Sequence, residues 1–337
     1  MTISILLNLG FLLSLLLSGN DKSSKIDKNT IFSALFWIGF TLSATALSLT
    51  RIDTLGSILL GLAGLIVFSY PYISSFILSI VGSIKIFPFA LGATIVGKYN
   101  DKKSWIRIAI FALTAIGIFI TSILIEGWDK TIAPFSYQGD RGIQVESILA
   151  TPFILSKVFT SNEYNVFLSD ISKSWEIEGY GTELALSLSP ILSVIFLSLA
   201  LLCAIFPFIR GNWTPMHFVR SSIFILALFF VCNKVLSPQY ILWLGGIVAV
   251  YIKKADNKKD IETSYKVAGI TVFITLLTSL IFPFYYDGVI EYTEENHYHN
   301  VIMSIILTVR NILLIVLTTV IGKVVFFRKK EVVEKES

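Results

Sequence analysis

The sequence predicts an all-α, polytopic helical membrane protein with about ten spans. Of its 337 residues, 54% are hydrophobic and 15% are charged, whereas charged residues make up about 25% of ordinary soluble domains. Apolar runs long enough to cross a hydrocarbon layer of about 30 Å recur along the whole chain. The two-residue alternation of an outer-membrane β-barrel is missing, so helices are the expected spanning elements.

Apolar runs define the expected spans. Read backwards from the basic carboxyl-terminal residues, six runs alternate in direction: 300–326, 264–284, 240–252, 217–233, 184–209 and 105–125. The amino-terminal third holds four more runs, at 2–18, 29–50, 55–70 and 72–97. Lys85 and Pro88 interrupt the last one. It is either one kinked span or two short helices that turn between Ile84 and Pro88 near the outer surface, and the second alternative places Met1 outside.

The distribution of charge predicts which side each connection faces. Basic residues gather near Lys102, Lys258 and Lys329, and the positive-inside rule assigns such connections to the cytoplasm. Segment 126–183 holds nine Asp or Glu against four Lys or Arg, and 285–299 is acidic as well. We therefore predict a multi-pass protein of the cell membrane whose active face lies outside the cytoplasm. The net charge of +4 follows from this distribution and does not indicate nucleic-acid binding.

We predict a single transmembrane domain over 1–330, with segment 126–183 inserted between spans, followed by a cytoplasmic tail at 331–337. Within the inserted segment, Asp140 to Leu155 carries a helical pattern, with Asp140, Gln144 and Ser147 on one face. This pattern predicts a short amphipathic helix that lies flat along the membrane interface.

Candidate functional residues are polar or charged groups where a plain span would have none. Lys85 lies in an apolar stretch, and an intramembrane lysine usually has a partner or a function, although it can also snorkel to the interface. Residues 138–147 combine two carboxylates with Arg141, whose planar fork suits a phosphate. They can equally form a local ion pair on a solvated helix. Arg310, deep in the last span, requires an anion or a carbonyl as its partner.

Residues 233–243 form a polar turn between two spans, in which Pro238 starts the second helix. Its Tyr240 and Trp243 are also typical of the aromatic belt at a membrane interface. The histidines and the two cysteines lack the spacing of a metal site or a disulfide framework, and no metal or other cofactor is expected. The sequence shows no phosphate-binding glycine loop, so ATP-driven and metallohydrolase functions lose support.

Five motifs taken together resemble the polyprenol-phosphate-mannose-dependent mannosyltransferases, a family of GT-C membrane glycosyltransferases. The motifs are Arg51-Ile-Asp53, Ile84-Lys-Ile-Phe-Pro88, Asp140-Arg-Gly-Ile-Gln-Val-Glu-Ser147, Asn233-Lys-Val-Leu-Ser-Pro-Gln-Tyr-Ile-Leu-Trp243 and Arg310-Asn311. The most specific is Lys-x-x-Ser-Pro-Gln-Tyr next to a tryptophan. The order and spacing of the motifs extend the resemblance over about 50–311.

The resemblance implies a GT-C-like fold and transfer of a hexose, typically mannose, from a polyprenyl-phosphate donor to a glycan or glycolipid acceptor with inversion. A carboxylate would deprotonate the acceptor, and basic residues would stabilise the departing lipid phosphate. The expected partners are this donor, the acceptor and membrane lipids. The predicted catalytic candidates are Glu146, Asp140 and Asp53. The predicted substrate-binding residues are Lys85, Arg141, Gln144, Lys234, Gln239, Tyr240 and Arg310.

Family members usually carry the catalytic aspartate in a large outer loop after their first span, whereas no such loop precedes residue 51 here. We therefore expect an amino-terminal portion of the family pattern to be absent. Two further hypotheses remain: a non-catalytic relative that binds lipid phosphate, and a transporter or flippase, although the paired broken helices of an internal repeat are not found. We also predict a shared site: Lys85, Arg141 and Lys234 should converge on one outward-opening cavity that binds the phosphate of the polyprenyl carrier.

Overall fold

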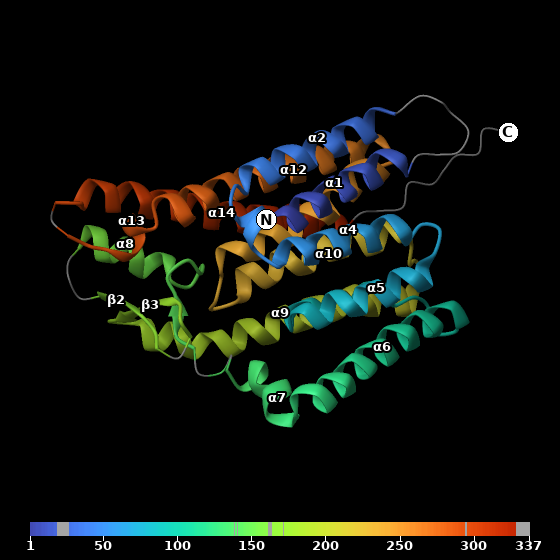
Figure 1. The fold of residues 1–337 in the computed structure, drawn as a ribbon, viewed down its shortest axis with the longest axis horizontal. Helices are drawn as coiled ribbons and strands as arrows, with labels where there is room; N and C mark the ends of the chain where they lie inside the picture. Colours follow the sequence, from blue (N-terminus) through green and yellow to red (C-terminus); the bar gives the residue numbers. More distant parts are fainter. Residues whose placement is uncertain are drawn as a thin grey trace.

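The computed structural model describes residues 1–18, 27–137, 139, 141–160, 164–170, 172–293 and 295–327, and most of these residues are helical (Figure 1). The elements are α1 (Thr2–Leu17), α2 (Lys28–Ser43), α3 (Leu47–Thr50), α4 (Asp53–Ile66), α5 (Pro71–Ile84), η1 (Phe87–Ile95), α6 (Lys102–Glu126), α7 (Trp128–Tyr137), β1 (Ile143–Gln144), α8 (Thr151–Phe159), β2 (Tyr164–Leu168), β3 (Trp175–Gly179), α9 (Thr182–Arg210), α10 (Pro215–Cys232), η2 (Pro238–Leu242), α11 (Trp243–Lys254), α12 (Lys258–Ser279), η3 (Leu280–Phe284), α13 (Asp287–Ile290) and α14 (His297–Phe327).

Five helices among the described residues are long and apolar enough to cross a membrane: α6, α9, α10, α12 with η3, and α14. The helices α1, α4 and α5 are apolar but shorter. The predicted class, a helical membrane protein, agrees with these elements. The predicted number of ten spans stays a prediction, because several of the predicted spans correspond to helices of only 12–16 residues.

The apolar run at 72–97 forms two short helices, α5 and the 3₁₀ helix η1, as the second sequence alternative predicted. Lys85 ends α5 with an extended backbone, and Pro88 occupies the first turn of η1. The ring of Pro88 removes a backbone donor and fixes φ, which favours the start of a new helix over continuation of the old one.

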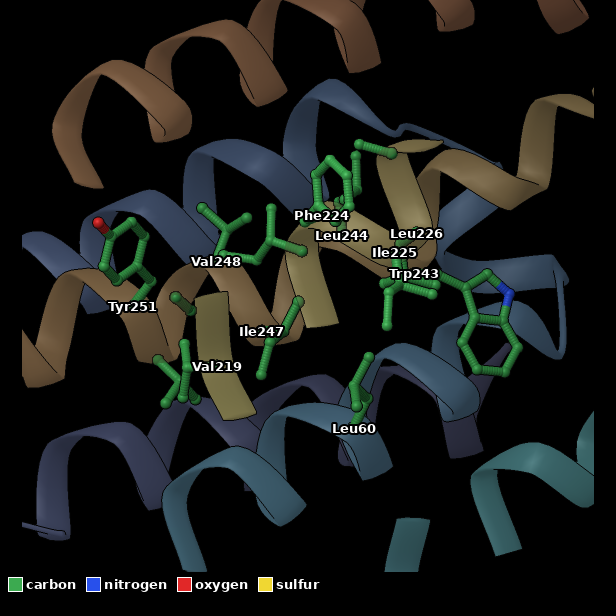
Figure 2. Close-up of a cluster of buried hydrophobic side chains, with 14 of the residues drawn as sticks. Leu60, Val219, Phe224, Ile225, Leu226, Trp243, Leu244, Ile247, Val248 and Tyr251 are labelled. Carbon is green, nitrogen blue, oxygen red and sulfur yellow. The ribbon is translucent and has the colours of Figure 1, made fainter. Parts of the chain in front are cut away.

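Helix α11 forms the centre of the hydrophobic core, with every residue from Trp243 to Lys253 buried (Figure 2). An all-round apolar helix is expected to be enclosed by other helices, and α2, α4, α10 and α12 surround it. Its contact with α4 is especially close: a Cβ on Gly246 would lie 2.1 Å from the Ser57 carbonyl oxygen. Small residues allow such backbone approach between membrane helices.

Segment 126–183 contains a small antiparallel sheet with strand order β1-β3-β2, in which Ile143 and Val166 both pair with Ile177. The predicted amphipathic helix over Asp140 to Leu155 is therefore wrong, because 143–144 form a strand and α8 begins only at Thr151. Backbone pairing overrides the helical pattern: the Val145 N–H donates to the Trp175 carbonyl at 3.1 Å. Gly142 packs so closely on Glu176 that a Cβ there would lie 2.5 Å from its carboxylate.

Two groups of connections lie far apart in the molecule. At one end, the basic end, the Tyr99 N–H donates to the Phe208 carbonyl. The Asn29 side-chain amide donates to the Ala255 carbonyl at the same end. At the other, the acidic end, segment 126–183 packs with α13 and the start of α14 around Ile143 and Met303. Figure 1 shows these ends at opposite extremes of the long axis. Which end faces the cytoplasm stays a prediction.

Cysteine labelling tests that orientation. We expect a membrane-impermeant maleimide to modify Lys130→Cys and Lys173→Cys in intact cells, and to modify Lys102→Cys and Lys258→Cys only after the membrane is opened. All four lysines are exposed, while the native Cys203 and Cys232 are buried and provide a low background. Labelling of Lys258→Cys in intact cells would contradict the predicted map.

Candidate functional site

Asp53, Lys85, Tyr240 and Trp243 form a compact group, the Lys85 cluster, where four elements meet. Lys85 is the residue at which α5 ends, and Asp53 is the first residue of α4. The Lys85 ammonium lies 2.5 Å from the Asp53 carboxylate. The Trp243 indole at the start of α11 donates to the same carboxylate oxygen at 2.7 Å. The Lys85 ammonium also lies over the Tyr240 ring, 4.4 Å from its centroid. Lys85 thus has a carboxylate and an aromatic partner, as an intramembrane lysine requires.

The crossing of α4 and α11 explains this geometry. Gly56 leaves room for the Trp243 ring, since a Cβ at Gly56 would lie 2.3 Å from it. Asp53 is almost fully buried at the amino terminus of α4. The Lys85 side chain is 24% exposed. Asp53 is therefore held by two donors, while Lys85 keeps part of its surface accessible.

The Lys85 cluster lies below the acidic end of the molecule. Helices α4 and α5 each contain 14 residues, which gives them a length of about 21 Å. A hydrocarbon layer is about 30 Å thick. Asp53 and Lys85 occupy the ends of these helices that lie away from the basic end, and we infer that they lie within the hydrocarbon depth.

Arg141 and Lys234 attach segment 126–183 to the turn between α10 and α11. The Lys234 ammonium donates to the carbonyls of Gly139 at 3.1 Å and Arg141 at 2.5 Å. In return, the Gln144 N–H donates to the Lys234 carbonyl at 3.1 Å. The Arg141 guanidinium donates to the Ser174 hydroxyl at 2.9 Å. It also lies beside the Tyr240 hydroxyl.

Tyr240 therefore joins the two sets of residues: Lys85 lies over its ring and Arg141 beside its hydroxyl. Lys234 follows through its bond to the Arg141 backbone. Lys85 and Arg141 thus share the neighbour Tyr240, and Lys234 binds the Arg141 backbone. What these cations bind, and whether they line one outward-opening cavity, stays a prediction.

Glu146 and Arg310 form a second group, fully buried between segment 126–183 and α14. The Arg310 guanidinium donates to the Glu146 backbone carbonyl at 2.9 Å and lies 3.4 Å from its carboxylate. Asn311 donates to the same carbonyl at 3.3 Å and to the Thr151 hydroxyl at 2.7 Å. The anion or carbonyl partner that the sequence required for Arg310 is thus supplied by Glu146.

Burial raises the pKa of Glu146 to about 7, although the nearby Arg310 charge acts in the opposite direction. The carboxylate is closed off from solvent and already faces a guanidinium. A general base must reach the proton that it removes. As described, Glu146 instead acts as an anchor that fixes segment 126–183 to the last span.

The remaining predicted residues have different surroundings. Gln239 is partly exposed next to Tyr240. Gln144 is buried in β1, and among the described residues its side-chain oxygen has no hydrogen-bond partner. Asp140 lies outside the described residues. The structure therefore leaves the predicted base unassigned: Asp53 and Glu146 are buried and bonded, and Asp140 is not described.

Glu176 is an organising residue that was not predicted from the sequence. Its carboxylate accepts from the Gly142 N–H at 3.1 Å and from the Ser172 hydroxyl at 2.5 Å. Ser174, which directly precedes β3, accepts a hydrogen bond from the Arg141 guanidinium. The alternation in Trp175-Glu-Ile-Glu-Gly179 would have predicted this strand, but it does not reveal that the strand orients Arg141.

The raised pKa of Glu146 predicts a pH-dependent stability. A carboxyl whose pKa is higher in the folded state contributes fully below its unfolded value and loses that contribution as pH rises through about 7. The loss amounts to about 3 kcal/mol. Between pH 5 and pH 8, the thermal unfolding midpoint of the wild type in detergent should therefore fall relative to that of Glu146→Gln.

The control is Glu291→Gln, which removes an exposed carboxylate and should follow the wild type. Parallel pH profiles of the wild type and Glu146→Gln would contradict the raised pKa.

Comparisons of the chain with protein-family models, curated proteins and solved structures found no match. The resemblance to the mannosyltransferases therefore rests on the five motifs alone. Residues from four of those motifs, Asp53, Lys85, Arg141 and Tyr240, lie together in the structure although they come from distant parts of the chain.

Proposed function

We propose that this protein is a membrane glycosyltransferase that moves a hexose from a polyprenyl-phosphate carrier to an outward-facing or lipid-linked acceptor. The preferred candidate for the hexose is mannose. The observation that supports this most is that Lys85 and Arg141 both lie next to Tyr240, with Lys234 bound to the Arg141 backbone. These cations come from separate motifs of the resemblance. A shared ligand with negative charge explains why they gather at one place.

The balance of charge in this region favours an anion. Arg51 adds a further positive charge close enough to act on Lys85. Among the described residues, Asp53 is the carboxylate that pairs directly with this group. Cations within the hydrocarbon depth are costly unless an anion compensates them. A lipid phosphate fits that need, because it enters from the bilayer and accepts hydrogen bonds from a guanidinium fork.

Aromatic side chains give the region an apolar wall. The Phe87 ring lies 5.4 Å from the Tyr240 ring and 5.3 Å from the Trp243 ring, centroid to centroid. Tyr240 and Trp243 are buried, so the partly exposed Phe87 ring beside them is the surface that suits the first isoprenoid units or the apolar face of a sugar. An inorganic phosphate or a soluble nucleotide would make no use of it.

In the proposed reaction, the acceptor hydroxyl attacks the anomeric carbon as the bond to the phosphate oxygen breaks. The configuration inverts, a carboxylate takes the hydroxyl proton, and the polyprenyl phosphate leaves with both bond electrons. Lys85 and Arg141 would stabilise the charge that develops on that phosphate. Asp53 would position Lys85 through their ion pair. Of the three candidate bases predicted from the sequence, we propose Asp140, which adjoins Arg141 in the sequence.

Binding of the carrier tests the phosphate site. With polyprenyl phosphate in lipid nanodiscs, we expect Lys85→Gln and Arg141→Gln each to weaken binding at least about tenfold, since each removes a charge-assisted contact. Lys85→Arg should retain most of the affinity. Lys173→Gln is the matched control, because this exposed lysine of segment 126–183 pairs with Asp170 and not with the carboxylate of the Lys85 cluster. Equal affinity of the wild type and both Gln variants would refute the site.

Transfer from synthetic polyprenyl-phosphate mannose, followed by mass spectrometry of the lipid products, tests the reaction. Asp140→Asn should lower the transfer rate about 100-fold or more at unchanged carrier binding, as expected for loss of a general base. Carrier binding by the wild type without transfer would identify the non-catalytic relative. Movement of the carrier across vesicles without cleavage would identify a flippase.

A further inference from the structure

A groove with three lysines opens at the basic end, on the side of the molecule opposite to the Lys85 cluster. It lies between the start of α12 and the end of α14. Its lining consists of Lys259, Glu262, Thr263, Lys266, Lys323, Val324 and Phe327. Three ammonium groups therefore face one carboxylate. We propose that this groove binds the phosphodiester headgroup of an anionic phospholipid from the adjacent leaflet.

The two helices bring their lysines to the same membrane boundary. In α12, Lys266 directly precedes the apolar run that begins at Val267. In α14, Lys323 interrupts the apolar run near its end, four residues before Phe327. Both side chains are exposed, and within the described part of the chain neither forms an ion pair with a carboxylate. A headgroup at that boundary therefore meets two ammonium groups, one from each wall.

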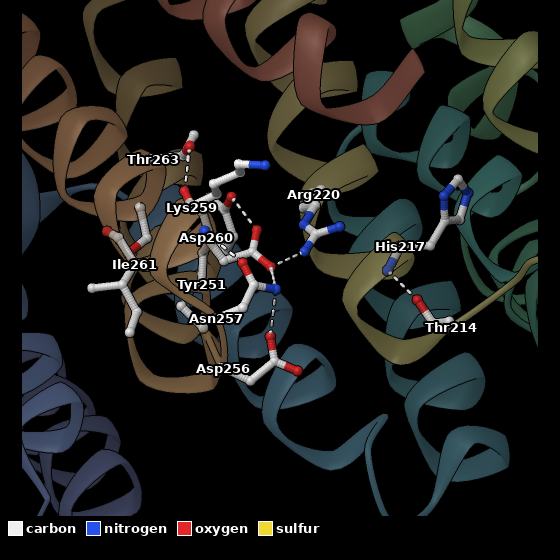
Figure 3. Close-up of polar contacts among 12 residues, drawn as sticks. Thr214, His217, Arg220, Tyr251, Asp256, Asn257, Lys259, Asp260, Ile261 and Thr263 are labelled. Atoms are coloured by element: carbon white, nitrogen blue, oxygen red, sulfur yellow. Dashed lines mark hydrogen bonds and ion pairs between the residues drawn. The ribbon is translucent and has the colours of Figure 1, made fainter. Parts of the chain in front are cut away.

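A buried ion pair fixes the direction in which α12 presents these residues. Asp260 is fully buried, pairs with Arg220 of α10, and accepts from the Tyr251 hydroxyl at 3.1 Å and the Asn257 amide at 3.0 Å (Figure 3). Asp260 therefore holds the first turn of α12 against α10 and α11. At helical spacing, Lys259, Glu262 and Lys266 share a different face, which forms the groove wall.

A neighbouring groove lacks the lysines that line the groove between α12 and α14. On the other side of α12, a second groove is lined by Phe32, Leu35, Phe36, Ile252, Tyr265 and Ala268. This lining contains no charged side chain. Both grooves lie near the basic end and both border α12, so an ordinary lipid chain can occupy either. The groove between α12 and α14 adds the cations that select an anionic headgroup, and basic pockets between membrane helices bind such lipids.

The exposed Phe327 ring supports a lipid as the occupant. Its exposed fraction is 81%, although it belongs to the groove wall. An aromatic side chain beside lysines at a helix end is typical of the membrane interface. A soluble anion would use the lysines but leave this ring and Val324 in water.

Native mass spectrometry of the full chain in neutral detergent tests this site. The probes are phosphatidylglycerol and phosphatidylcholine with identical acyl chains. The test variant is Lys266→Gln with Lys323→Gln. The matched control is Lys102→Gln with Lys103→Gln, two exposed lysines at the start of α6. A lipid at the Lys85 cluster is unaffected by either pair, so the number of bound lipids separates the two sites.

We expect the wild type to bind one more phosphatidylglycerol than the test variant. At about 1 kcal/mol per lysine, the loss of two lysines should weaken the affinity of the test variant for this lipid about 30-fold. The control should stay within about twofold of the wild type. Equal binding of both lipids, equal loss in both variants, or no loss in the test variant would each refute the proposal. Displacement of the lipid by inorganic phosphate at equal concentration would also refute it. Unchanged unfolding midpoints without lipid confirm that the variants are folded.

Discussion

The close contact of α4 and α11 sets the position of each group in the Lys85 cluster. Gly246 lies against the Ser57 carbonyl, and its N–H donates to the Ser57 hydroxyl at 3.0 Å. Inside a membrane, helices gain stability from such close packing, because lipid tails are as apolar as leucine side chains. Larger side chains at this crossing would separate the helices. They would also separate Trp243 from Asp53, and the carboxylate would lose one of its two donors.

Segment 126–183 depends on α14 and on the turn after α10 in a comparable way. Arg310 and Asn311 bind the backbone around Glu146, and Lys234 binds the carbonyl of Arg141. These contacts use backbone carbonyls, which every residue type provides. These hydrogen bonds to the backbone therefore do not depend on which side chains residues 141 and 146 carry. The side chain of Arg141 stays available to bond Ser174 and to lie beside Tyr240.

The sequence predicted the helical membrane class, allowed two short helices at 72–97 as one of two alternatives, and singled out Lys85, Arg141 and Tyr240, which lie next to one another in the structure. Each prediction rested on a local signal: apolar length, a proline after a lysine, or a charge in an apolar run. The predicted helix over 140–155 was wrong because long-range pairing with Trp175 and packing of Gly142 on Glu176 outweigh a local pattern. The partner of Arg310 was unpredictable for the same reason, since Glu146 lies 164 positions away in the chain.

The depth of the Lys85 cluster exposes it to the transmembrane voltage. In the predicted orientation, an anion that reaches Lys85 from outside crosses roughly the outer third of the hydrocarbon layer. A potential that is negative inside opposes this movement by roughly 0.7 kcal/mol for one charge at 100 mV, or about threefold in affinity. If the protein has the proposed function, the position of one lysine at the end of a 14-residue helix would make anion binding depend on the transmembrane voltage.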